Sequence, residues 1–267
     1  MKQLSRVSLA DVQAVYAGAE RDLWELVMGE QIHIGGLQSS LDLARRAGIQ
    51  SGSRGVDLCC CTGAGMRFLL RFCNVAQMVG VDATPEALEL GCARSKAEGL
   101  DARVRFVHAE ATATRLPDAG FDFVWGEDAW CYVADKPALV AEAARLARPG
   151  GTIAFTDWVE GPAGLTDGEA ERFMAFMKFP RVEDLESYRA LLERNGCEVL
   201  VAEDTGRFAP YVDLYLDMLN RQLTYDALKL LNFDQQTMQA IGGEMQFMQQ
   251  LAHAGKIAQG LLVARKR

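Results

Sequence analysis

The chain has 267 residues, 49% of them hydrophobic and 24% charged, a size that suits one large globular domain or a domain with a substantial insertion. Its formal net charge of −8 argues against a nucleic-acid-binding protein, because such proteins need a basic face to replace counterions. No run of about 18 apolar residues and no apolar segment near the start occurs, which predicts a cytoplasmic protein without a membrane span or secretory signal.

The first 50 residues have helical periodicity. Apolar residues recur at helical spacing over 11–27 and again over 38–47. Both segments precede the first strand-like segment of the chain. Residues 1–50 are therefore expected to form a helical cover beside the main domain.

The centre of the chain alternates between strand-like and helix-like segments. Residues 85–99 open with Pro85 and predict a helix, and residues 137–147 predict another. Strands separated by helices of this length predict right-handed βαβ units and a parallel sheet covered on both faces. The predicted strands are 54–59, 77–82, 103–107, 121–126 and 151–156.

The last third of the chain predicts a helix over 183–195 and strands near 197–202 and 257–264. The segment between those two strands is rich in Tyr, Leu, Met and Gln and is too long for a hairpin loop, so it is expected to form a helical lid. The expected organisation is a cover at 1–50, a core at 51–203 and 257–267, and a lid at 204–256.

Seven cysteines accompany only three histidines, and no C-x-x-C occurs. Zinc-type spacing is therefore absent, and adjacent cysteines do not easily satisfy disulfide geometry with one another. We expect no metal site and interpret the cysteines as reduced thiols that act as small apolar side chains. Their positions are 59, 60, 61, 73, 92, 131 and 197.

Acidic residues follow the predicted strands at the edge where a doubly wound sheet binds its ligands. The first strand reaches Asp57, and the second ends at Asp82, 25 residues later, a distance that suits binding of ribose hydroxyls. The third leads to Glu110-Ala111, which suits an adenine ring, and the fourth to Glu127-Asp128. Each acid taken alone could be a helix cap, but four at the same edge indicate an adenosyl site.

No G-x-G-x-x-G and no G-x-x-x-x-G-K-[ST] occurs, so the sequence does not predict binding of a dinucleotide or a nucleoside triphosphate. A cofactor without phosphate, such as S-adenosylmethionine, relaxes that demand. The segments VDLCCCTGAG, VGVDATPEAL, HAEATATRLP, FDFVWGEDAW and ARPGGTIAFTD resemble the class I S-adenosylmethionine-dependent methyltransferases, whose first motif typically reads D-x-G-x-G-x-G. The resemblance implies a Rossmann-like α/β fold with a seven-stranded, mostly parallel sheet, S-adenosylmethionine as cofactor and S-adenosylhomocysteine as product.

Aligned on that first motif, Cys59 and Cys61 take the places of the first two glycines, and Gly63 matches the third. The three consecutive cysteines are thus expected to belong to the cofactor loop. A Cβ where the backbone needs a positive φ costs about 1–2 kcal/mol and crowds the cofactor.

The segments VYAGAERDLWELVMGEQIHIGGL, WGEDAWCYVADK and AGKIAQGLLVARKR are more specific and resemble sarcosine/dimethylglycine N-methyltransferases and phosphoethanolamine methyltransferases. The resemblance implies catalytic roles for Tyr16 and Asp128, and Tyr132 replaces a histidine of those families. The cofactor contacts that it implies are Trp24, Ile34, Gly35, Asp57, Cys59, Cys61, Gly63, Asp82, Ala83, Glu110, Ala111 and Glu127.

The favoured reaction is methyl transfer to a small-molecule acceptor, with an amine nitrogen as the methylated atom. Asp128 would handle the proton, Tyr16 or Tyr132 would orient the amine, and Trp24 and Trp130 either form an aromatic wall or pack in the core. The open alternatives are C- or O-methylation of a specialised metabolite and a non-catalytic binding protein that kept the fold. An acidic acceptor would need a basic anchor, and a homodimer is left open. Candidate anchors are Lys178, Arg181, Arg207, Arg221 and Lys229.

Overall fold

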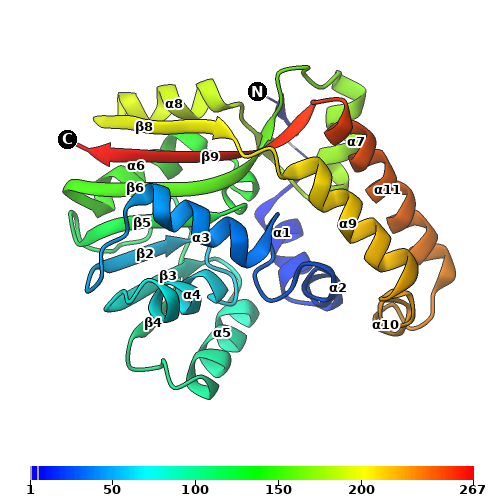
Figure 1. The fold of residues 1–267 in the computed structure, drawn as a ribbon, viewed down its shortest axis with the longest axis horizontal. Coiled ribbons are helices and arrows are strands. Elements are labelled where there is room, and N and C mark those ends of the chain that lie inside the picture. The colour runs from blue at the N-terminus through cyan, green and yellow to red at the C-terminus, as the bar shows by residue number, and fades with distance from the viewer. Residues whose placement is uncertain (1, 5) are drawn as a thin grey trace.

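A computed structural model describes residues 2–4 and 6–267, and its centre is a seven-stranded sheet in the order β4-β3-β2-β5-β6-β9-β8 (Figure 1). All neighbouring strands are parallel except at β9, which runs antiparallel to both β6 and β8. The predicted α/β class with a mostly parallel sheet is confirmed. The strands are β2 (Arg54–Leu58), β3 (Gln77–Asp82), β4 (Val104–His108), β5 (Phe121–Glu127), β6 (Ala147–Glu160), β8 (Cys197–Asp204) and β9 (Ile257–Lys266).

Helices cover both faces of this sheet because side chains alternate along each strand. Val56 and Leu58 of β2 pack in one apolar cluster with α6 and α8, whereas Phe123 and Trp125 of β5 pack in another with α3 and α4. Both faces of the sheet are therefore apolar, as expected of parallel strands. The helices are α3 (Gly36–Ala47), α4 (Ala64–Phe72), α5 (Pro85–Ala97), α6 (Lys136–Leu146) and α8 (Leu185–Arg194).

The N-terminal cover contains a break that the periodicity did not predict. Instead of one helix over 11–27, the chain forms α1 (Leu9–Tyr16) and α2 (Ala19–Met28). Gly18 lies between them as the N-cap of α2 with an extended backbone, φ −137° and ψ −160°, and this conformation interrupts the helix. The break places Tyr16 at the end of a helix beside the sheet edge.

Four further elements went unpredicted or were too short in the prediction. The strand expected at 151–156 extends over β6, with a register shift where it meets β5 between Phe121 and Phe123. Helix α7 (Asp167–Met177) follows it, and β1 (Lys2–Gln3) pairs with β7 (Arg181–Val182) in a separate two-stranded sheet.

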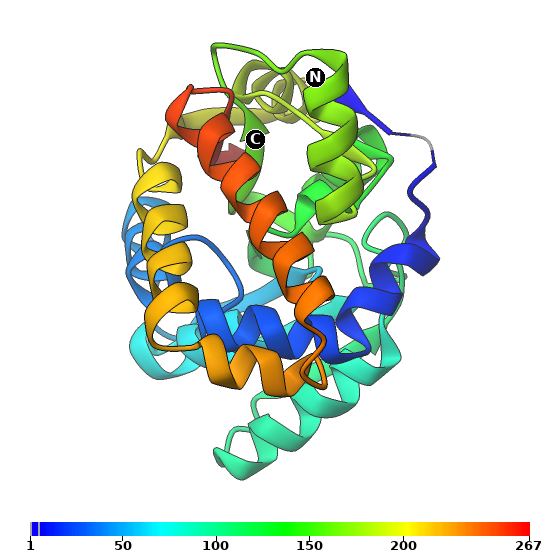
Figure 2. The ribbon, with the colours of Figure 1, turned by 90° about the vertical axis from the view of Figure 1, so that its right-hand side faces the viewer.

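The long segment before the last strand is helical. It contains α9 (Phe208–Arg221), α10 (Thr224–Leu230) and α11 (Gln235–His253), which lie beside α2 and α7 and away from most of the sheet (Figures 1 and 2). A cluster of buried residues joins these helices to α2 and α7. Within residues 2–4 and 6–267, no helix combines the length and the apolar character needed to cross a membrane.

Candidate active site

The cysteine loop joins β2 to α4 and is held against β3. The backbone N–H of Cys59 donates to the Val81 carbonyl at 2.9 Å, and that of Cys61 donates to Oδ2 of Asp82 at 2.8 Å. Cys59 has φ +65° and Cys61 has φ +47°, both in the left-handed region. The loop therefore has the conformation of a glycine motif, although cysteines occupy two of its positions.

The three thiols of this loop are protonated at neutral pH. Burial raises the pKa of Cys59, Cys60 and Cys61, and the negative charge of Asp82 raises it further. All seven cysteines of the chain are free. Because the thiolate is the reactive form, these loop cysteines act as small neutral side chains.

A cavity of about 280 Å³ opens above the loop at the carboxyl edge of the strands. This is the edge where ligands bind in doubly wound sheets. Eleven of the predicted site residues line it, namely Tyr16, Asp57, Cys59, Cys61, Asp82, Ala83, Glu110, Ala111, Glu127, Asp128 and Tyr132.

Four predicted cofactor contacts lie outside the wall of this cavity. Gly63 is the N-cap of α4 with φ +73°, so it shapes the loop through its backbone. Ile34 and Gly35 lie behind the wall, where the N–H of Ile34 donates to Oδ2 of Asp128 at 2.8 Å. Trp24 is buried and lines a smaller, neighbouring cavity.

Carboxylates surround the inner end of the loop. A Cβ on Gly65 would lie 2.6 Å from Oε2 of Glu127 and 3.4 Å from Oδ2 of Asp57, so the glycine lets the helix start close to both acids. Burial raises the pKa of Asp57 well above its usual value, and the charges of Glu127 and Asp82 add to the effect. Such a cluster favours a positively charged ligand, because a cation would stabilise the ionised acids.

Asp82 and Ala83 close the opposite wall of the cavity. The other carboxylate oxygen of Asp82, Oδ1, accepts the N–H of Thr84 at 2.9 Å, so this one side chain orders both the loop and the start of α5. Gln13 of α1 donates to the Ala83 carbonyl at 2.6 Å and ties the cover to this wall. The arrangement fits a ribose at Asp82 with an adenine beyond it.

Two tyrosines meet above the acids. The hydroxyl of Tyr16 donates to the hydroxyl of Tyr132 at 2.7 Å, and their rings pack edge to face with centroids 5.3 Å apart. Burial raises the pKa of both hydroxyls well above 10.0. Both tyrosines therefore stay protonated at neutral pH, and the hydrogen of Tyr132 is available to a ligand.

Asp128 follows β5 with φ +49°, a conformation that aspartate tolerates better than most residues. Its buried carboxylate accepts the Ile34 N–H, and Gln259 Nε2 donates to its Oδ1 and Oδ2 at 3.0 and 2.9 Å. Burial raises the pKa of Asp128, and the nearby His33 opposes that change. The carboxylate is thus fixed in position and more basic than one on the surface.

His33 lies in the cavity wall and also has a supporting role. Its Nε2 lies 3.1 Å from Oγ of Ser40 and 3.3 Å from Oε1 of Glu127. Ser40 in turn donates to that Glu127 oxygen at 2.6 Å. The network joins α3 to the end of β5 and fixes Glu127 in the cavity wall.

Several residues that shape this site were missed by the sequence interpretation. Gln259 on β9 orients Asp128 from 131 residues away. Buried Lys136 donates to the carbonyls of Trp130 and Val133 at 2.6 Å each, and supports the short helix Trp130–Tyr132 that carries Tyr132. These contacts join distant strands and turns, and no local motif marks them.

The two tryptophans differ in which of the two alternatives they follow. Trp130 is fully buried and stacks on Phe155 with centroids 3.9 Å apart, so it packs in the core and does not face the cavity. Trp158 of β6, which the sequence interpretation did not single out, lines a small cavity together with Tyr16 and Tyr132. Trp158 and Trp24 line a second cavity of about 20 Å³, here called the inner chamber. The inner chamber is lined by Tyr16, Trp24, Met28, Ile32, Asp128, Tyr132, Trp158 and Met177.

Comparisons with known proteins identify the family of the chain. A family model described as a methyltransferase domain matches residues 56–155. The 27-O-demethylrifamycin SV methyltransferase of Amycolatopsis mediterranei is 31% identical over 202 residues, which cover 70% of this chain and 74% of that protein. Other matched proteins carry the names of N-, C- and O-methyltransferases, and the chain spans 41%, 44% and 43% of the length of three of them, respectively.

Solved structures share the fold at low sequence identity. A candidate sarcosine dimethylglycine methyltransferase from Galdieria sulphuraria superposes with a TM-score of 0.82 at 21% identity, covering 93% of this chain and 98% of that one. Phosphoethanolamine N-methyltransferase 2 of Haemonchus contortus, solved with phosphomonomethylethanolamine and S-adenosylhomocysteine, gives 0.83 at 20% identity, covering 97% of this chain and 58% of that one. With the matched sequence of the Amycolatopsis protein, these findings show that the chain belongs to the class I S-adenosylmethionine-dependent methyltransferases and acts on a small molecule.

Proposed function

We propose that this enzyme transfers the methyl group of S-adenosylmethionine to the nitrogen of a small amine. The observation that supports this most directly is the buried carboxylate of Asp128, which borders both the large cavity and the inner chamber. It lines both together with Tyr16 and Tyr132. An amine bound at this junction would meet one proton acceptor and one hydroxyl donor.

The residues of the large cavity fit S-adenosylmethionine. Asp82 would accept the ribose hydroxyls, Glu110 and Ala111 would meet the adenine, and Asp57 and Glu127 would face the cationic methionine end beside Gly65. When bound, the cofactor would supply an electrophilic methyl carbon, and its sulfur would take back the electrons of the C–S bond. The ammonium form of the acceptor has no free lone pair, so its nitrogen would first have to give one proton to Asp128.

The proton balance explains the need for Asp128. An alkylamine with a pKa near 10 is about one part in a thousand neutral at pH 7, and supplying that form costs about 4 kcal/mol. Burial raises the pKa of Asp128, so its carboxylate accepts a proton more readily than a surface aspartate would. The hydrogen of Tyr132 would orient the acceptor, and Tyr16 would hold Tyr132 in place.

O-methylation is the second candidate, and it is favoured by the Amycolatopsis relative, whose name gives 27-O-demethylrifamycin SV as its acceptor. An aliphatic hydroxyl is nearly as weak an acid as water, whose pKa is about 15.7. A carboxylate is too weak a base to remove that proton before transfer. The Asp128 site therefore suits an amine better than an alcohol.

The first experiment is calorimetric titration of the protein with S-adenosylmethionine and S-adenosylhomocysteine, followed by an acceptor screen with amines and alcohols. Binding of both cofactor forms and turnover of an amine would support the proposal. Lack of cofactor binding would refute the assignment of the large cavity, and turnover of alcohols alone would refute the amine.

Asp128→Asn then tests the proton acceptor. Asparagine tolerates the positive φ of Asp128 and can still accept the Ile34 N–H, so the variant should fold and bind S-adenosylhomocysteine as the parent does. Turnover should fall about 10²- to 10⁴-fold. Turnover within threefold of the parent would refute a proton-accepting role for Asp128.

A further inference from the structure

The inner chamber is a part of the proposed active site that the cofactor assignment does not use. It shares Tyr16, Ile32, Asp128 and Tyr132 with the large cavity, so it opens where the acceptor nitrogen would lie. Its other walls come from α2, β6 and α7. They are Trp24, Met28, Trp158 and Met177.

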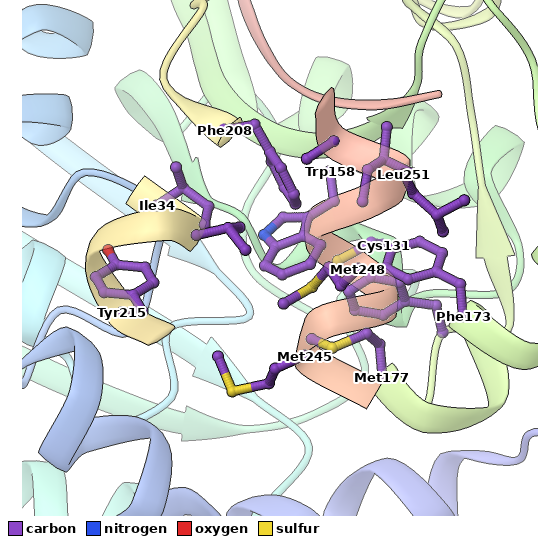
Figure 3. Packing of buried hydrophobic residues seen from close by; sticks show 14 of the residues in the cluster. Ile34, Cys131, Trp158, Phe173, Met177, Phe208, Tyr215, Met245, Met248 and Leu251 are labelled. Carbon is purple, nitrogen blue, oxygen red and sulfur yellow. The ribbon is translucent and has the colours of Figure 1, made fainter. Parts of the chain in front are cut away.

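Apolar side chains continue behind these walls. Figure 3 shows Trp158 surrounded by Met177, Met248 and Phe173, with Phe208 above it. The Trp158 ring stacks on Phe173 with centroids 6.1 Å apart and meets Phe208 edge to face at 4.6 Å. The chamber is therefore lined and backed by aromatic rings and methionines from β6, α7 and the lid.

Four of the five basic residues proposed as anchors for an acidic acceptor contact other groups, and the fifth, Lys229, lines neither cavity. Arg207 pairs with Asp42 at 2.5 Å, and Arg221 pairs with Asp217 at 2.6 Å. Nζ of Lys178 donates to the Ala175 carbonyl. Among the described residues, neither cavity wall contains a lysine or an arginine, while the large cavity contains seven carboxylate residues. Those carboxylates are Glu30, Asp57, Asp82, Glu110, Glu127, Asp128 and Asp135.

We infer that the inner chamber binds an apolar part of the acceptor, and that the substrate is an amine with an apolar body and no carboxylate or phosphate. The inference rests on the proposed function and names its substrate class. An acid placed among Trp24, Trp158 and Met177 would lose its water without gaining a counter-ion, which is costly. An alkyl or aryl group there gains contacts, and a methylated ammonium beside the rings gains cation–π attraction.

The present volume of the chamber also limits the acceptor. About 20 Å³ holds one water or one methyl group, so a larger substituent must displace a wall side chain. Met28 and Met177 are unbranched and flexible, and they can adjust to a substituent at little cost. The chamber should therefore accept a range of apolar groups.

Calorimetry measures the affinities of matched ligands for the complex of the parent protein with S-adenosylhomocysteine. N-methylpropylamine and sarcosine are both N-methylamines, and an ethyl group in the first takes the place of the carboxylate in the second. Phosphoethanolamine is a primary amine that carries a phosphate. N-methylpropylamine should bind at least tenfold more tightly than either acid, and each added methylene should raise affinity up to about fourfold. Equal or tighter binding of sarcosine or phosphoethanolamine would overturn the inference, and so would failure of the whole alkylamine series to bind.

The two proposals fail in different ways. Loss of S-adenosylhomocysteine binding would refute the proposed function, whereas intact binding with a preference for acidic ligands would refute only the apolar chamber.

A charge introduced into the chamber gives a second test. Met177→Lys should raise the affinity of sarcosine relative to N-methylpropylamine by at least tenfold, whereas Met177→Leu should leave that ratio as in the parent. An unchanged ratio in a folded Met177→Lys variant would show that the acceptor does not reach Met177 and would overturn the assignment. If the lysine variant does not fold, the comparison of ligands for the parent protein decides alone.

Discussion

The cysteine loop offers a sharp test of the backbone geometry, because neighbouring cysteines differ in φ. Cys59 and Cys61 have positive φ, whereas Cys60 does not. A left-handed conformation costs a residue with a Cβ about 1–2 kcal/mol, and glycine costs about 0.5–1 kcal/mol in lost chain freedom. At position 59 or 61, the Cys→Gly variant should therefore be more stable than the Cys→Ala variant by about 0.7 kcal/mol. At position 60, the Cys→Gly variant should be less stable than the Cys→Ala variant by about that amount.

Alanine is the reference because it removes the thiol in every variant and leaves only the effect of the Cβ. The double variant Cys59→Gly/Cys61→Gly should exceed Cys59→Ala/Cys61→Ala by about 1.5 kcal/mol in free energy of unfolding. Cys60→Gly should be less stable than Cys60→Ala. The glycine variant at 60 also loses the Cβ of that residue, which packs close to Gly80: a Cβ placed on Gly80 would lie 3.1 Å from it.

Urea unfolding measures this difference as a shift of the midpoint at constant slope. The same preference at all three positions, whether for glycine or for alanine, would refute the argument from φ. Affinity for S-adenosylhomocysteine is a second measurement: the double glycine variant should bind at least as tightly as the parent, because it restores the glycines of the motif. Weaker binding there would show that the thiols themselves contribute to the cofactor site.

Three further predictions concern the acids and their partners. Asp82→Ala should weaken cofactor binding at least 100-fold, and calorimetry that shows unchanged affinity would refute the ribose assignment. The same variant should lower the free energy of unfolding by about 2–3 kcal/mol in urea, because the Asp82 carboxylate also accepts the Cys61 N–H. Gln259→Leu should move the acid limb of the kcat–pH profile to higher pH, because Gln259 lowers the pKa of Asp128 and turnover needs the ionised carboxylate. An acid limb at the same pH as in the parent would contradict the proton-accepting role of Asp128. The ratio of S-adenosylmethionine to S-adenosylhomocysteine affinity should fall as pH falls, because burial raises the pKa of Asp57 and the protonated acid no longer attracts the sulfonium. A ratio that does not change on acidification would refute this reasoning.

Much of the cofactor half of the site could be predicted, because it depends on short segments. Asp57, Asp82 and Glu127 lie at or near the ends of strands whose hydrophobic pattern is clear, and parallel strands bring those ends to one edge. The break at Gly18 was not predictable from periodicity, since α1 and α2 keep apolar residues at similar spacing on either side. The burial of Trp130 depends on stacking against Phe155 of another strand, which no local pattern records.

The inner chamber, proposed to bind the acceptor, is built by residues from separate elements and not by one short motif. Trp24, Trp158 and Met177 come from α2, β6 and α7, and none of them lines the large cavity. Substitutions at these positions can change the volume and charge of the inner chamber while Asp82 and the cysteine loop keep their contacts. With the acceptor in the inner chamber, as proposed, its selection depends on side chains far apart in the sequence, whereas the reaction depends on the cofactor site. The matched proteins carry the names of N-, O- and C-methyltransferases, as expected where acceptor and cofactor sites vary separately.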